Sequence, residues 1–164
     1  MFLIGTILIS SCGSKDDECT KTLEIPHYAL KNNKFERYVV MEEVSCDFIV
    51  KDLGPLPLKN FTYEVLNFIF IPDTGTQTSR LKFEIKLNNP NNYAVEGLAY
   101  ITTQSAGDTS EYTGTYSDLA SVPCHKIGGN SSCILTYDVD YPYNSDVGAP
   151  ESMEVVKVEY YIAN

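Results

Sequence analysis

Five cysteines are the residues of this chain best suited to chemistry: Cys12, Cys19, Cys46, Cys124 and Cys133. A cysteine sulfur can ligate zinc, act as a nucleophile or join a disulfide. Structural zinc sites favour closely spaced Cys-x-x-Cys pairs, and the sequence contains none. We therefore predict that these cysteines do not form a zinc site. An odd number of cysteines in an exported chain calls for a separate role for one of them.

The chain begins with an apolar run, MFLIGTILI over residues 1–9, followed by two serines and Cys12. This run is too short to cross a bilayer, which takes about 20 apolar residues, but it matches the apolar core of a secretory signal peptide. The alternative is a buried first strand with a free thiol, which fits poorly with the polar GSKDDE that follows. We expect residues 1–11 to be a signal peptide that is removed.

The segment Ile9-Ser10-Ser11-Cys12 resembles the lipobox of bacterial lipoproteins, an aliphatic residue and two small residues before the cysteine. The resemblance implies that the chain is cut just before Cys12 and that its sulfur carries a diacylglycerol.

A charged tether follows Cys12 and includes Lys15, Asp16, Asp17 and Glu18. It resembles the acid-rich export signal of Bacteroidota surface lipoproteins. That resemblance implies an outer-membrane protein, lipid-anchored and exposed on the cell surface. The alternative is an ordinary flexible linker that leaves the protein facing the periplasm.

If Cys12 is lipidated, four cysteines remain, and an oxidising compartment predicts two disulfides. Cys124 and Cys133 flank HKIGGNSS, whose Gly-Gly pair can turn the chain and bring the two within bonding distance. Cys19 then pairs with Cys46 by elimination, and this bond is expected to pin the N-terminal segment to the domain. A bond between Cys19 and Cys133 is the alternative.

His27 and His125 are the only histidines that could serve a Ser-His-Asp or Cys-His site. His125 adjoins Cys124, but adjacent residues rarely face each other in the required geometry. Asp138 and Asp140 would share one face of a strand, where they could hold calcium or simply be solvated. No phosphate-binding loop or HExxH motif is present. We predict no enzymatic activity and no cofactor.

Tyrosines are frequent toward the C-terminus, where aromatic rings could form a platform for a glycan or a partner protein. Alternation along strands would instead turn half of these rings into a core. The residues are Tyr137, Tyr141, Tyr143, Tyr160 and Tyr161.

The formal net charge of −10 argues against a nucleic-acid partner, because phosphate groups would repel such a surface. A surplus of acids also keeps an exposed protein soluble. Calcium or a basic partner protein is the alternative reason for the surplus.

Strand signals dominate the chain, and no segment keeps a helical period. Leu81, Phe83, Ile85 and Leu87 alternate with polar residues, which is typical of a strand with one buried face. Gly97 is the expected site of a β-bulge, and the Gly-Pro-Leu-Pro run at 54–57 reads as a linker. The predicted strands cover residues 35–41, 46–50, 60–71, 81–88, 93–103, 111–116, 133–141 and 153–162.

This strand spacing predicts an all-β fold, an antiparallel β-sandwich of about seven to eight strands over residues 59–164. Residues 12–58 form a separate N-terminal segment. The stretch LKFEIKLNNPNNYAVEGLAY at 81–100 resembles the early hairpin of small immunoglobulin-like domains of bacterial envelope proteins, the FxLYD and desiccation-protein-like sandwiches. The resemblance, which covers about one hairpin and the final strand, implies an immunoglobulin-like topology and no binding residues.

These features together lead us to expect a membrane-anchored envelope lipoprotein that is a non-catalytic binding or assembly module on the cell surface. Its partners would be the membrane, through the lipid, and an envelope protein or a glycan. One alternative is a periplasm-facing structural subunit of an envelope complex. Another is a small hydrolase that uses carboxylates.

Overall fold

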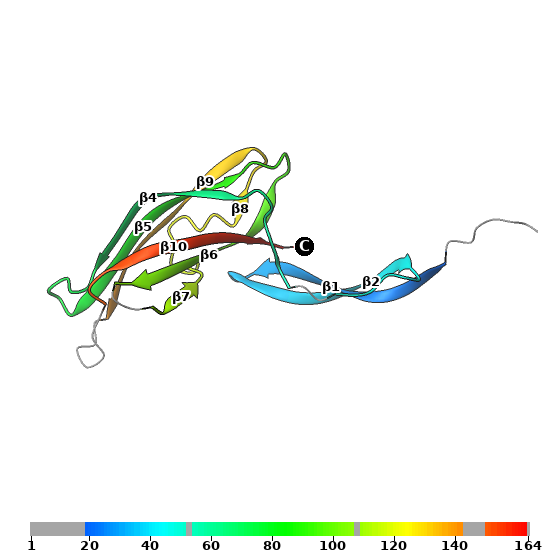
Figure 1. Cartoon of the computed structure of the whole chain (residues 1–164), viewed down its shortest axis with the longest axis horizontal. Helices are drawn as coiled ribbons and strands as arrows, with labels where there is room; N and C mark the ends of the chain where they lie inside the picture. The colour runs from blue at the N-terminus through cyan, green and yellow to red at the C-terminus, as the bar shows by residue number, and fades with distance from the viewer. Residues whose placement is uncertain (1–18, 52–53, 107–108, 143–149, 164) are drawn as a thin grey trace, which may run out of the picture.

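The computed structural model describes residues 19–51, 54–106, 109–142 and 150–163. These residues form ten β-strands, and no helix able to cross a membrane occurs among them (Figure 1). The predicted signal peptide, Cys12 and the acidic tether lie outside the described residues.

The first two strands form a long hairpin, β1 (Thr20–Lys31) and β2 (Lys34–Ser45), paired without interruption from Thr20↔Ser45 to Lys31↔Lys34. Asn32 and Asn33 make the turn with φ angles of 49° and 57°. A two-residue turn with both φ angles positive matches the twist of the strands it joins, and asparagine tolerates that conformation.

The sequence predicted part of this hairpin. The strand expected at 35–41 lies within β2, but β1 was not anticipated. The strand expected at 46–50 is wrong, because Cys46 and Asp47 form a turn in which the Phe48 amide donates to the Ser45 carbonyl at 3.0 Å.

The other eight strands form two antiparallel sheets, which confirms the predicted all-β sandwich. One sheet has the order β4-β5-β9 and the other β3-β10-β6-β7, with β8 paired to β6. Their bounds are β3 Leu56–Pro57, β4 Thr62–Ile71, β5 Thr78–Asn89, β6 Val95–Ser105, β7 Glu111–Gly114, β8 Lys126–Ile127, β9 Ser131–Pro142 and β10 Met153–Ile162.

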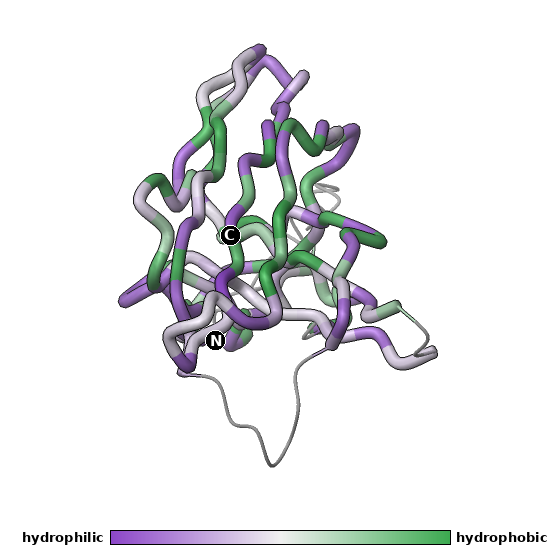
Figure 2. Tube along the Cα trace, turned by 90° about the vertical axis from the view of Figure 1, so that its left-hand side faces the viewer, coloured by the Kyte–Doolittle hydropathy of each residue, from purple (hydrophilic) through white to green (hydrophobic). Residues whose placement is uncertain are grey.

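The core lies between these two sheets. The alternating residues of β5, from Leu81 to Leu87, are buried, as the sequence predicted. They share one buried cluster with Ile101 of β6 and Val158 of β10 from the opposite sheet. The same alternation of hydrophobic and hydrophilic residues is visible along the strands in Figure 2. One face of each sheet is therefore removed from water.

Gly97 is not a β-bulge, contrary to expectation. Its pairing with Ile162 continues the register between β6 and β10, and the shift in that register falls at Val156 of β10 instead. A Cβ at Gly97 would collide with the carbonyl oxygen of Tyr161. Glycine is needed here because the neighbouring backbone approaches too closely for a side chain.

The Gly-Pro-Leu-Pro run that read as a linker is partly built into the sandwich. Leu56 and Pro57 form β3 against the end of β10, and Leu58 is buried in the core. A two-residue edge strand can contain proline because the outer side of an edge strand needs no amide donor.

The hairpin lies to one side of the sandwich (Figure 1). Its Asn-Asn turn is directed toward the sandwich, where β1 comes next to β6, and its other end points away. The chain enters the hairpin at that distant end, so the segment that leads back to Cys12 joins the molecule there.

Candidate functional site

Both predicted disulfides are present. Cys124 and Cys133 are bonded with their Cα atoms 5.8 Å apart, across the loop that contains Gly128 and Gly129. Cys19 and Cys46 are bonded with a Cα separation of 5.4 Å. The expectation that the second bond pins the N-terminal segment to the domain is wrong, because both its cysteines belong to the hairpin. The bond closes the end of the hairpin that faces away from the sandwich.

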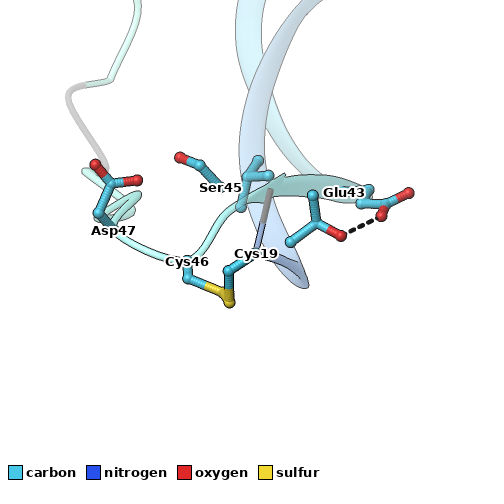
Figure 3. A pocket seen from close by; sticks show the side chains of 7 residues that line it. Cys19, Glu43, Ser45, Cys46 and Asp47 are labelled. Carbon is cyan, nitrogen blue, oxygen red and sulfur yellow. Dashed lines mark hydrogen bonds between the residues drawn. A yellow bond between two sulfur atoms is a disulfide. The ribbon is translucent and has the colours of Figure 1, made fainter. Parts of the chain in front are cut away.

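An open recess of about 620 Å³ surrounds the Cys19–Cys46 bond (Figure 3). Glu43 and Asp47 lie on either side of the disulfide, and Ser45 lies between them along the chain. A hydrogen bond from Ser45 holds the pKa of the exposed Asp47 carboxyl below its usual value. Both sulfur atoms are already bonded to each other, so the recess offers acidic oxygens but no thiolate nucleophile.

In the part of the chain that the structure describes, the two histidines do not form a catalytic pair with a cysteine. His27 Nε2 lies 2.7 Å from Glu42 Oε1, and its ring stacks on Tyr38 with the centroids 5.5 Å apart. His125 follows Cys124, whose sulfur is in a disulfide. Within the described residues, neither histidine therefore faces a free cysteine thiol that it could activate.

Asp138 and Asp140 share one face of β9, as predicted, and basic side chains of β5 neutralise them. Arg80 Nε lies 2.7 Å from Asp138 Oδ1 and 3.8 Å from Asp140 Oδ1, while Lys82 Nζ lies 3.7 Å from Asp138. The hydrogen bond from Arg80 holds the pKa of Asp138 below its usual value. These carboxylates thus already have cationic partners, and the described residues contain no cluster of three acidic, histidine or cysteine side chains suited to a metal.

The tyrosines toward the C-terminus divide between core and surface. Tyr137 and Tyr160 are buried, Tyr161 is half-buried and Tyr141 is exposed. Tyr143 lies outside the described residues. Two of these rings therefore belong to the core and two reach the surface, and their role as a binding platform stays a prediction.

Tyr161 contributes to a small recess on the outer face of the β10–β6–β7 sheet, which we call the tyrosine recess. It has a volume of about 270 Å³ and is lined by Pro55, Tyr100, Thr113, Glu159 and Tyr161. The Tyr100 and Tyr161 rings meet edge to face, with their centroids 5.1 Å apart and an interplanar angle of 73°. Partial burial raises the pKa of Tyr100 above its usual value.

An ion pair lies beside these rings, with Lys157 Nζ 2.8 Å from Glu159 Oε1. The recess therefore offers apolar ring surface next to a donor and an acceptor, which suits recognition of another molecule more than bond breaking. Tyr100 was missed in the sequence. No local pattern marks it, because its place beside Tyr161 follows from the register in which Tyr100 pairs with Glu159 of β10.

The hairpin and the turn after it, residues 19–51, form a unit that we call the arm. Seven of the twenty large hydrophobic side chains exposed in the described part of the chain lie there. They are Tyr38, Val39, Val40 and Met41 of β2, and Phe48, Ile49 and Val50 beyond the Cys19–Cys46 bond. Scattered exposed apolar residues are ordinary, but consecutive runs such as 38–41 and 48–50 form a candidate interaction surface.

Comparisons of the chain with protein families, with characterised proteins and with solved structures found no significant match.

Proposed function

We propose that this protein is a lipid-anchored envelope lipoprotein that acts as a non-catalytic binding or assembly module. Cys12 carries the lipid, the acidic tether directs the protein to the outer surface of the outer membrane, and the arm and sandwich make the contacts. The observation that carries this proposal is the arm itself, a disulfide-closed hairpin outside the sandwich that exposes apolar side chains on β2.

A two-stranded hairpin is marginal in water without a sheet or helix to pack on. Here the Cys19–Cys46 bond restricts the unfolded arm, while residues 38–41 remain exposed. Covering apolar surface contributes about 25 cal/mol per Å². A partner that covers β2 therefore supplies stabilisation that the chain itself does not provide there.

The outer edge of β2 suits a protein partner. Within the described part of the chain β2 pairs with β1 alone, so its other edge is open to a further strand. A strand from another protein can add to such an edge through main-chain hydrogen bonds. The run Tyr38–Met41 has the β-branched and aromatic character that favours strand pairing. The tyrosine recess provides a second contact on the sandwich. We also propose that the sandwich has an immunoglobulin-like topology.

Site-specific photo-crosslinking in cells tests the assembly role. A photoreactive residue in place of Val39 on β2 should give one adduct of defined mass with an envelope protein. The same residue in place of Ile134, an equally exposed site on β9 of the sandwich, serves as the control. Absence of an adduct at Val39, or identical adducts at both positions, would contradict the proposal.

A further inference from the structure

We infer that the end of the arm closed by the Cys19–Cys46 bond is a membrane-contact site, which inserts Phe48 and Ile49 into the interface of a zwitterionic phospholipid bilayer. This inference rests on the proposed function, because the lipid on Cys12 is what brings the arm to the bilayer. It adds a second contact with lipid, made by the protein's own side chains.

The first argument is where these side chains lie. Phe48 is 41% exposed, Ile49 is 74% exposed and Val50 is 38% exposed. Ile49 is thus the most exposed large hydrophobic residue in the described part of the chain. The turn in which the Phe48 amide donates to the Ser45 carbonyl keeps this apolar triplet close to the Cys19–Cys46 bond.

The second argument is the length of chain between this end and the lipid. Six residues lie between Cys12 and Cys19, and the seven steps from one Cα to the other span at most about 25 Å in an extended chain. The disulfide-closed end therefore cannot move far from the bilayer surface. Each strand of the hairpin has 12 residues, which is about 40 Å at the rise of a β-strand. The sandwich, which lies at the other end of the hairpin (Figure 1), can consequently stand well away from the lipid.

The third argument is charge. Residues 19–51 contain five basic and five acidic side chains, whereas residues 52–164 contain six basic and fourteen acidic ones. An acidic surface is repelled by anionic head groups, and an electrically balanced one is not. The arm is therefore the part of the chain suited to approach lipid. Because its charges balance, contact should depend on apolar insertion and not on anionic lipid.

The chain contains no tryptophan, so Ile49→Trp creates a single fluorescent reporter at the proposed contact. The lipidated mature variant is reconstituted into phosphatidylcholine vesicles, with and without bromine on the acyl chains. Emission from the introduced tryptophan should shift to the blue and be quenched by the brominated lipid. The matched control, Ile134→Trp on the sandwich, should keep its aqueous emission. Addition of phosphatidylglycerol should not increase quenching in the Ile49→Trp variant.

A second substitution tests the side chains themselves. Phe48→Asp in the Ile49→Trp background should lower the partitioning of the unacylated chain into the same vesicles about tenfold, as expected for loss of one inserted aromatic side chain. Leu119→Asp, at an exposed apolar site of the sandwich, should leave the partitioning unchanged. Equal losses in both variants would overturn the inference.

The outcomes separate this inference from the proposed function. If the Ile49→Trp protein floats with the vesicles and its tryptophan is not quenched, the membrane contact is refuted and the lipid anchor stands. If the protein expressed in its native host carries no acyl mass on Cys12, both fail. If the tryptophan emission shifts to the blue without lipid as protein concentration rises, a second copy covers the triplet and the inference is wrong.

Discussion

Two buried polar side chains, Asn89 and Tyr160, hold the loops at one end of the sandwich. The Asn89 carboxamide donates to the carbonyls of Tyr93 at 2.8 Å and Gly128 at 3.0 Å and accepts from the Asn91 amide at 3.1 Å. The Tyr160 hydroxyl lies 3.0 Å from the Cys124 carbonyl oxygen and 2.9 Å from that of His125. Buried polar groups with partners on separate loops fix how those loops pack.

Tyr160→Phe should reduce the free energy of unfolding by about 1–2 kcal/mol, because it leaves buried carbonyl groups without their donor while preserving the ring. Urea denaturation measures this loss. Tyr112→Phe is the control, since that ring is 66% exposed. An unchanged midpoint for Tyr160→Phe would show that the two carbonyls find other partners.

Alkaline pH should destabilise the protein through its buried tyrosines. Burial raises the pKa of Tyr160 above its ordinary value. The folded chain therefore keeps a proton that the unfolded chain releases above about pH 10. The contribution of this group to stability is complete below that pH and is lost as pH rises. Melting temperatures measured between about pH 9 and pH 11 should fall less steeply for Tyr160→Phe than for the wild type. Parallel curves would contradict this assignment.

Gly97→Ala should cost about 2–3 kcal/mol of stability, since the added methyl group meets the Tyr161 carbonyl oxygen and, at 2.8 Å, the Tyr160 ring. The Tyr161 carbonyl belongs to a paired strand, so it cannot rotate away from the new methyl group as a flexible side chain could. Gly128→Ala is the matched control, because the nearest atom to its Cβ is 3.4 Å away, on Ser131. Thermal denaturation of both variants compares them, and equal melting temperatures would argue against the close approach.

At the scale of the elements, the two disulfides act on different units. Cys124–Cys133 spans nine residues of a loop beside the core, while Cys19–Cys46 spans 27 residues and encloses the whole hairpin. The hairpin has its own sheet and is not part of either sandwich sheet. Local opening of the arm without unfolding of the sandwich is therefore the expected behaviour.

The double variant Cys19→Ala/Cys46→Ala should open the arm and leave the sandwich folded. The loop-entropy model assigns about 3.5 kcal/mol to a bond of this span, which a lone hairpin cannot replace. Amide hydrogen exchange should show loss of protection in β1 and β2 only. Retained protection of β2, or loss of protection throughout β5, would refute this division into two units.

At the scale of the whole molecule, the described structure joins an electrically balanced arm to an acidic sandwich. The chain enters the arm at the end remote from the sandwich (Figure 1), so under the proposed function the anchor and the sandwich lie at opposite ends of the arm. Such an arrangement suits a protein that is held at one end and makes contacts along its length.

Replacing Lys15, Asp16, Asp17 and Glu18 with alanine should move the protein from the cell surface to the periplasmic face without unfolding it. The physical reason is that a solvated charged segment beside the lipid can be recognised without altering the fold. Protease shaving of intact cells measures the exposure, and Glu151→Ala/Glu154→Ala controls for loss of acidic charge elsewhere. If the four-alanine variant is shaved like the wild type, the tether carries no address.

Removal of the proposed lipid site, Cys12, should have an effect different from that of the tether substitutions. Cys12→Ala should leave the precursor uncut or release the protein from membranes, since a single thiol carries the proposed anchor. Detergent partitioning of native and variant proteins, with the mass of the mature chain, measures this. A wild-type mature protein that has no acyl mass would end the lipoprotein assignment.

The sequence by itself was sufficient for the all-β class, for strands β4, β5, β6, β7, β9 and β10, and for both disulfide pairings. Alternation of polar and apolar residues is local information, and an even set of cysteines with one short loop leaves few pairings. Pro26 shows the limit of such patterns. Proline lacks the amide donor of a strand residue, yet Pro26 is tolerated within β1 because, in the described part of the chain, β1 pairs only on one side.

Only the tertiary structure decided what these elements form together. The pairing of β10 with β6 brings Tyr161 to the sheet face that carries Tyr100, and the long hairpin sets residues 38–50 outside the sandwich. Register, edges and the close approach at Gly97 depend on residues far apart in the chain. Their energies come from non-local contacts, which no window of the sequence contains.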